Sequence, residues 1–320
     1  MHDAATGMNV HQIGALSNGL AIVVAFTLTA VGASVQLETR DQTLFRGRTD
    51  LVSVGVTVAA KRHRFITNLS AENFAVYEDG RPQQIFAFAS GAQPGPPLHV
   101  GVLLDVSGSQ GLDLKFTQRA VIKFLASVPD AIDVTFIDFA SHVRSGRYSQ
   151  SDLPRLVRRV RELTAGGETS LYDAIGLYLD GASEQDGRKV MVLYTDGGDT
   201  FSSMSFDTLM TLLKASDVTV YAIGALEQQP LFEQVTERAV LEQIAEETGG
   251  SAFFPGGVKD LDRIYEQVRG EIQAQYTIGY VSNNEKADGA WRKVEIKINC
   301  KDSKKLRVFV RKGYYAPTRP

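Results

Sequence analysis

The chain has 320 residues, of which 43% are hydrophobic and 22% charged, so it can bury one large core or two smaller ones. This composition excludes a disordered chain, a collagen-like chain and a disulfide-rich miniprotein. The 34 Lys and Arg residues against 37 Asp and Glu residues give a net charge of −3 without any basic block, so we expect no nucleic-acid partner. Cys300 is the only cysteine, which excludes an intramolecular disulfide and any cysteine-built metal site.

The first segment, 1–33, has the features of an export signal. No charged residue occurs over 13–35, and 20–31 is a continuous apolar run of signal-peptide length that small residues follow. We expect a signal peptide cleaved near Ala33, and hence a periplasmic, cell-surface or extracellular protein. The alternatives are an uncleaved anchor, which would be the only link to a membrane, and a buried core helix.

The next segment, 34–95, carries strand patterns. Valine alternates with Ser, Gly or Thr over 52–58, which is the period of a strand with one buried face. Two more apolar runs, 74–78 and 83–88, flank an Asp-Gly dipeptide at 79–80, which is typical of a two-residue hairpin turn. The segment is therefore predicted to be β structure.

A proline-rich linker at 93–97 precedes a change to strands alternating with helices. We predict strands over 98–104, 134–139, 189–195, 218–223 and 251–254. We predict helices over 112–127, 153–163, 171–182, 206–215, 237–248 and 258–273. Apolar strands that alternate with helices indicate a parallel sheet covered on both faces, so 96–273 is predicted to be an α/β domain with a doubly wound, mostly parallel sheet.

Strand patterns return in the last segment, 274–320, over 276–281, 291–298 and 306–310. Three or four strands on each side of the α/β domain are marginal as an independent fold. We therefore predict that 274–320 pairs with 34–95, so that the α/β domain is inserted in or flanked by a small β-sandwich. Two independent small β domains are the alternative.

Oxygen-bearing side chains gather at the predicted carboxyl edge of this sheet. Asp105, Ser107 and Ser109 follow the first apolar strand, Thr169 precedes a helix, and Asp196 follows another buried strand. Ligands of open α/β sheets bind at this edge. Carboxylates and hydroxyls suit a hard divalent cation, Mg²⁺ first, with Mn²⁺ or Ca²⁺ as alternatives. Because few of these ligands are anionic, the cation could bind an external carboxylate at an open position.

Five residues together resemble the metal-ion-dependent adhesion site of von Willebrand factor type A domains: Asp105, Ser107, Ser109, Thr169 and Asp196. The resemblance covers about 97–273, and no element of the motif is missing. It implies that the first three residues bind the metal directly, the threonine does so in the ligand-bound form, and the last aspartate binds directly or through water. The flanking segments are similar to bacterial exported proteins related to von Willebrand factor A. The implied function is adhesion through a Glu or Asp of a protein ligand.

Several competing interpretations stay open at this stage. Asp105 and the two serines could merely cap the following helix. Asp173 could accept hydrogen bonds from the serine hydroxyls or complement a helix dipole, and Asp199 could shape the metal rim or form a plain turn. No nucleophile elbow surrounds Ser107, and no P-loop or dinucleotide motif follows the first strand, so we predict no catalytic residue. A structural part of a cell-envelope assembly and a metal-dependent hydrolase are the alternative functions.

Overall fold

The computed structural model describes residues 51–61, 64–90, 95–111, 113–128, 130–300 and 303–318. The described residues belong to one compact unit. The predicted export segment, 1–33, lies outside the described residues. Within the described ranges, no helix is both long and apolar enough to span a bilayer.

A six-stranded sheet with the order β11-β10-β9-β6-β7-β8 forms the centre of the α/β part. Its strands are β6 (Leu98–Asp105), β7 (Ala131–Phe139), β8 (Val143–Ser149), β9 (Arg188–Thr195), β10 (Val218–Gly224) and β11 (Ala252–Phe253). Neighbouring strands are parallel except for β7 and β8. Strand β6 is buried along its whole length, as expected for a central strand covered on both faces. The predicted mostly parallel, doubly wound sheet is confirmed.

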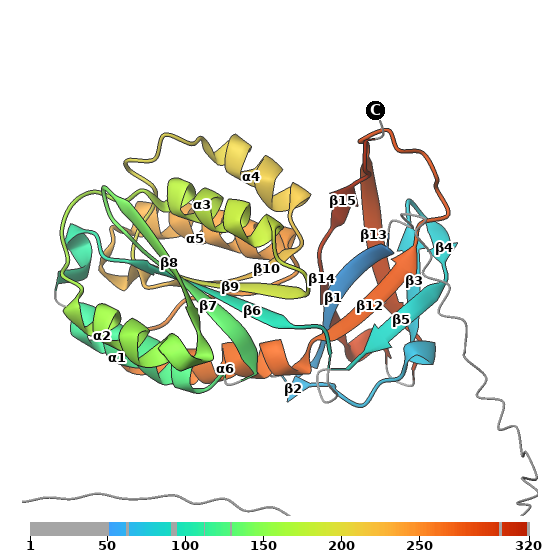
Figure 1. The fold of residues 1–320 in the computed structure, drawn as a ribbon, viewed down its shortest axis with the longest axis horizontal. Coiled ribbons are helices and arrows are strands. Elements are labelled where there is room, and N and C mark those ends of the chain that lie inside the picture. The colour runs from blue at the N-terminus through green and yellow to red at the C-terminus, as the bar shows by residue number, and fades with distance from the viewer. Residues whose placement is uncertain are drawn as a thin grey trace, which may run out of the picture. The chain divides into compact units, whose positions relative to one another are not determined.

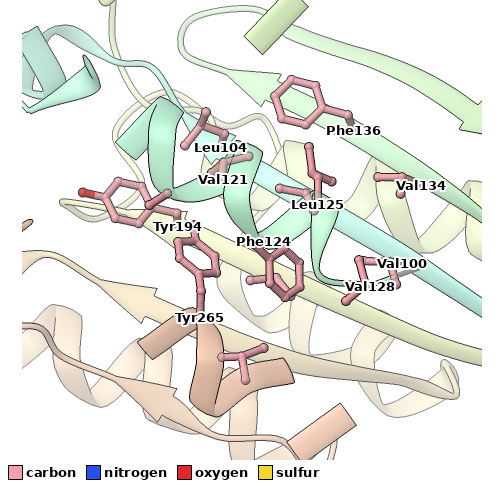
Figure 2. Close-up of a cluster of buried hydrophobic side chains, with 14 of the residues drawn as sticks. Val100, Leu104, Val121, Phe124, Leu125, Val128, Val134, Phe136, Tyr194 and Tyr265 are labelled. Atoms are coloured by element: carbon pink, nitrogen blue, oxygen red, sulfur yellow. The ribbon is translucent and has the colours of Figure 1, made fainter. Parts of the chain in front are cut away.

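Helices cover both faces of this sheet. They are α1 (Leu114–Ala126), α2 (Leu153–Glu162), α3 (Leu171–Ser183), α4 (Phe206–Ala215), α5 (Leu231–Glu247) and α6 (Leu261–Ala274). Figure 1 shows α1, α2 and α6 on one face and α3, α4 and α5 on the other. Figure 2 shows the first of these layers, in which Phe124 of α1 packs against Tyr265 of α6 with ring centroids 5.2 Å apart. These apolar contacts fix the helices against β6 and so position the loops that follow it.

Two antiparallel sheets, with the orders β14-β1-β12-β5 and β15-β13-β3-β4, form the β part, and β2 also pairs with β1. The strands before the α/β part are β1 (Leu51–Ala60), β2 (Arg64–Phe65), β3 (Phe74–Glu78), β4 (Arg81–Gln83) and β5 (Ile85–Ala89). The strands after it are β12 (Tyr276–Val281), β13 (Trp291–Ile298), β14 (Arg307–Val310) and β15 (Gly313–Tyr315).

Strands from before and after the α/β part pair with each other in both sheets. Strand β1 pairs with β12 and β14, and β3 pairs with β13. Apolar side chains of both sheets share one core, which includes Val54, Phe74, Tyr276 and Val294. The predicted fold class, an α/β domain inserted in or flanked by a β-sandwich, is therefore confirmed (Figure 1).

The structure differs from the predicted elements at β8, which the sequence does not indicate. This edge strand is mostly polar, and Tyr148 is its only buried residue. Arg144 pairs with Asp138 of β7 at 2.6 Å, and Arg147 pairs with Asp133 of β7. Ion pairs to a neighbouring strand replace the apolar pattern that would have marked the strand.

The predicted hairpin is correct at its turn and wrong in its second strand. Asp79 and Gly80 have φ of 48° and 79°, as a two-residue turn with two positive φ angles requires. Only β4 returns along β3, whereas β5 pairs with β12 in the other sheet. The apolar run at 83–88 did not reveal this change of sheet.

Helix α5 begins at Leu231, six residues before the predicted helix. Its first turns expose Leu231, Phe232 and Val235, with exposed fractions of 76%, 83% and 63%. Their positions have the spacing of a helix, so the sequence does carry a signal for these turns and the predicted start at 237 was too late.

Glu271 of α6 makes the stability of the fold depend on pH. Burial raises the pKa of this carboxyl from an ordinary 4.5 to about 7, although the Ser251 hydroxyl donates to it at 2.9 Å. Between these values the folded state holds a proton that the unfolded state releases, so stability is expected to fall as pH rises from about 4.5 to about 7. The loss should be at most about 3 kcal/mol. Urea unfolding across this range should show a flatter profile for Glu271→Gln; parallel profiles would contradict the prediction.

Candidate metal centre

Three connections at the carboxyl ends of β6 and β9 carry the predicted metal residues. Asp105 is the last residue of β6, and Ser107 and Ser109 lie in the turn that follows it. Thr169 lies two residues before α3 begins, and Asp196 directly follows β9. Strands β6 and β9 are parallel neighbours, so their carboxyl ends meet at one edge of the sheet.

A chain of hydrogen bonds joins four of these side chains. The Asp105 carboxylate accepts bonds from the Ser107 amide at 2.8 Å and from the Thr195 hydroxyl at 2.6 Å. The Ser107 and Ser109 hydroxyls lie 3.1 Å apart, and Ser109 donates to Asp196 Oδ1 at 2.9 Å. The structure therefore brings Asp105, both serines and Asp196 together.

Thr169 reaches the same place through its own loop. Ser107, Ser109 and Thr169 all line one pocket of about 430 Å³. The Thr169 amide donates to the Thr200 hydroxyl at 2.9 Å, and its carbonyl accepts bonds from the amides of Thr200 and Phe201. Three hydroxyl-bearing side chains thus face a common space.

The two aspartates of the centre carry an electrostatic cost. Asp105 is fully buried, and burial raises its pKa to about 6 against the opposing hydrogen bonds from Ser107 and Thr195, while nearby Asp196 raises it further. Burial also raises the pKa of Asp196, against the hydrogen bond from Ser109. Among the described residues, neither aspartate forms an ion pair with a Lys, Arg or His. A divalent cation would offset this buried negative charge.

Asp173 and Asp199 hold the loop that follows β9. The Asp173 carboxylate accepts bonds from the Ser203 and Met204 amides, both at 2.9 Å. Asp199 accepts a bond from the Tyr172 amide at 3.1 Å and another from the Ser202 hydroxyl. These bonds tie the loop after β9 to the start of α3, although Asp199 also lines the pocket.

Sequence reasoning missed four residues at the centre. Thr195 binds Asp105 directly, and its position just before Asp196 was the signal for it. Gln229 donates to the Asp196 carbonyl at 2.8 Å. Glu233 and Glu237 of α5 line the pocket. The predicted helix began only at 237, so the sequence did not indicate that the start of this helix lies beside the site.

The residues present fit a hard divalent cation. The donor set consists of carboxylate and hydroxyl oxygens, which Mg²⁺, Mn²⁺ and Ca²⁺ prefer. In the described part of the chain, no three or more His, Cys, Asp or Glu residues are grouped to hold a metal. A cation at this edge would therefore depend on the serine and threonine hydroxyls as well as on the two aspartates.

Comparisons with known proteins agree with this fold. Residues 99–267 match the von Willebrand factor type A domain family. A search of curated proteins finds no match to the chain.

The solved structures that are similar to the chain include bacterial surface proteins. The PilB minor pilin from Streptococcus sanguinis is 14% identical with a TM-score of 0.48, over 57% of this chain and 62% of the pilin chain. The vWF domain of the type V pili tip protein Mfa5 from Porphyromonas gingivalis is 11% identical with a TM-score of 0.48, over 56% of this chain and 96% of that one. The pilus adhesin SpaC from Lactobacillus rhamnosus GG is 11% identical with a TM-score of 0.48, over 82% of this chain and 48% of the adhesin chain.

Proposed function

The chain belongs to the von Willebrand factor type A domain family, and on this premise we propose that it is a metal-dependent protein-binding module. The observation that carries the proposal is a pair of aspartates, Asp105 and Asp196, that hydrogen bonds link beside the pocket. Among the described residues, no basic side chain neutralises either aspartate. Asp105, Ser107 and Ser109 would hold the cation directly, with Thr169 and Asp196 completing the set. A bound Mg²⁺ would supply an open position for a Glu or Asp side chain of the partner.

The surface beside the pocket supports a protein as the ligand. Exposed Leu231, Phe232 and Val235 lie on the first turns of α5, next to Gln229, which binds the Asp196 carbonyl. Exposed apolar side chains that cluster beside a polar site are typical of a protein interface. We propose an exported adhesive protein at the cell surface, in the periplasm or outside the cell, and we propose no catalytic activity.

The proposal is tested with a short peptide that carries one central aspartate between glycines. NMR titration of the chain should show shifts at the pocket in Mg²⁺, no shifts in chelator, and none with a peptide that has asparagine instead. Stabilisation by Mg²⁺ without any binding of the aspartate peptide would instead favour a structural part of a cell-envelope assembly. Turnover of phosphoester or peptide substrates that disappears in Asp105→Ala would favour the metal-dependent hydrolase.

A further inference from the structure

The pocket of the metal centre is bordered by acidic side chains. Glu168, Asp199, Glu233 and Glu237 line it together with the hydroxyl-bearing residues, and its lining includes no Lys, Arg or His. The three glutamates come from two separate elements, the loop before α3 and the first turns of α5. They form an acidic rim, by which we mean Glu168, Glu233 and Glu237.

The two rim residues of α5 act together. Glu233 and Glu237 are four residues apart on one helix, so they lie on the same side of it. Burial raises the pKa of Glu237, and the charges of Glu233 and Asp199 raise it further. This crowding of like charges marks the rim as a region of negative potential at the mouth of the pocket.

Basic side chains of the described residues do not neutralise the rim. Among the residues that the structure describes, none of the three glutamates has an ion-pair partner, and the only hydrogen bond to a rim carboxylate is a weak one, from the Thr200 hydroxyl to Glu168 at 3.3 Å. Arg238 follows Glu237 directly, but it pairs with Glu242 at 3.0 Å and stacks on Phe254 with its guanidinium carbon 4.1 Å from the ring centre. The basic group nearest in sequence is thus engaged outside the pocket.

The negative charges of the acidic rim restrict which protein segment can bind in the pocket. A divalent cation would neutralise Asp105 and Asp196, so an incoming carboxylate would still meet three unpaired glutamates. Like charges at this range disfavour binding, whereas basic side chains beside the carboxylate would form ion pairs with the rim.

We propose that the protein segment that binds this pocket carries Lys or Arg side chains next to its metal-binding carboxylate, and that these pair with Glu168, Glu233 and Glu237. This inference rests on the proposed function. The acidic rim would select among protein partners, because it would repel an acidic segment that has no basic neighbours.

The test uses three pentapeptides with a central aspartate flanked by glycines and with lysine, glutamine or glutamate at both ends. NMR titration of the chain in Mg²⁺ should show that the lysine peptide binds about threefold to tenfold more tightly than the glutamine peptide. The glutamate peptide should bind more weakly than both. The preference for lysine should shrink as salt concentration rises, because the rim is exposed.

Variants of the two exposed rim residues locate the effect. The double variant Glu168→Gln and Glu233→Gln should bind the lysine and glutamine peptides with nearly equal affinity. Glu184→Gln is the matched charge control, since it lies at the far end of α3, about 20 Å along the helix from the pocket. This control should keep the full preference for lysine.

The outcomes separate this inference from the proposed function. Equal metal-dependent binding of all three peptides would overturn the inference and leave the proposed function standing. A lysine preference that persists in the double variant would also overturn it. If no peptide binds in Mg²⁺, both the inference and the proposed function are wrong.

Discussion

Mg²⁺ at about 100 times its dissociation constant is expected to raise the free energy of unfolding by about 2.7 kcal/mol, and Asp105→Asn is expected to abolish this increase. Asp105 is fully buried at the end of β6, and both of its carboxylate oxygens are positioned by hydrogen bonds from Ser107 and Thr195. Asparagine keeps the shape of the side chain but removes the charge that would hold the cation. Thermal unfolding in Mg²⁺ and in chelator measures the increase, and a shift of roughly 5 to 10 °C is expected for the unchanged chain.

Asp180→Asn is the matched control for this experiment. Asp180 is an exposed residue of α3 and does not line the pocket, so the control should keep the full Mg²⁺ effect. An equal Mg²⁺ effect in Asp105→Asn and in the unchanged chain would show that the cation binds elsewhere.

Glu78→Ala is expected to destabilise the β part by about 2 to 5 kcal/mol, at about 1 to 3 kcal/mol for each buried hydroxyl left unpaired. Glu78 is 2% exposed at the end of β3, and its carboxylate accepts hydrogen bonds from Tyr280 at 3.0 Å, Tyr314 at 2.7 Å and Ser282 at 2.5 Å. Alanine would leave the hydroxyls of Tyr280 and Tyr314 without this acceptor, and Ser282 with only a long bond to the Asn284 carbonyl at 3.4 Å. This costs far more than the loss of one exposed hydrogen bond. Urea unfolding monitored by tryptophan fluorescence is suitable, because Trp291 lies on β13, the strand that pairs with β3.

Glu78→Gln distinguishes the lost acceptor from the lost charge. Glutamine keeps one oxygen acceptor, so its effect should be clearly smaller than that of alanine. Neither variant should change the Mg²⁺ effect, since Glu78 belongs to the β part and not to the pocket of the metal centre. A loss below about 1 kcal/mol in Glu78→Ala would contradict the assigned role.

The α/β fold class was predictable because its buried strands are apolar in sequence. A strand covered on both faces, such as β6, is apolar at most of its positions, unlike a strand or helix with one exposed face. The same logic placed Asp105 and Asp196, because each directly follows such a strand or ends it. Strand β8 was missed because an edge strand can be stabilised by ion pairs to its neighbour instead of by apolar burial.

The sequence placed the candidate metal ligands at one edge of the sheet, but it did not indicate the residues around them. Spacing along the chain identified Asp105, Ser107 and Ser109, since they share one turn. Glu233 and Glu237 could not be assigned to the site, because contacts between distant segments, and not a local pattern, decide which residues of a helix border a pocket. The expected role of Asp173 beside Ser107 and Ser109 remains a prediction from sequence; in the structure its carboxylate accepts hydrogen bonds from the amides of Ser203 and Met204.

The sequence by itself determined most strands and helices of the α/β part, though not β8 or the start of α5, and it determined which oxygen-bearing residues follow the strands, since burial and chain order leave local patterns. Only the tertiary structure decided how the two β flanks interleave, with β1 between β12 and β14, and which acidic residues border the pocket. The physical reason is that strand partners and pocket neighbours are chosen by contacts between segments far apart in sequence; Glu78 and Tyr280, for example, are 202 residues apart. Such contacts leave no periodic signal within either segment.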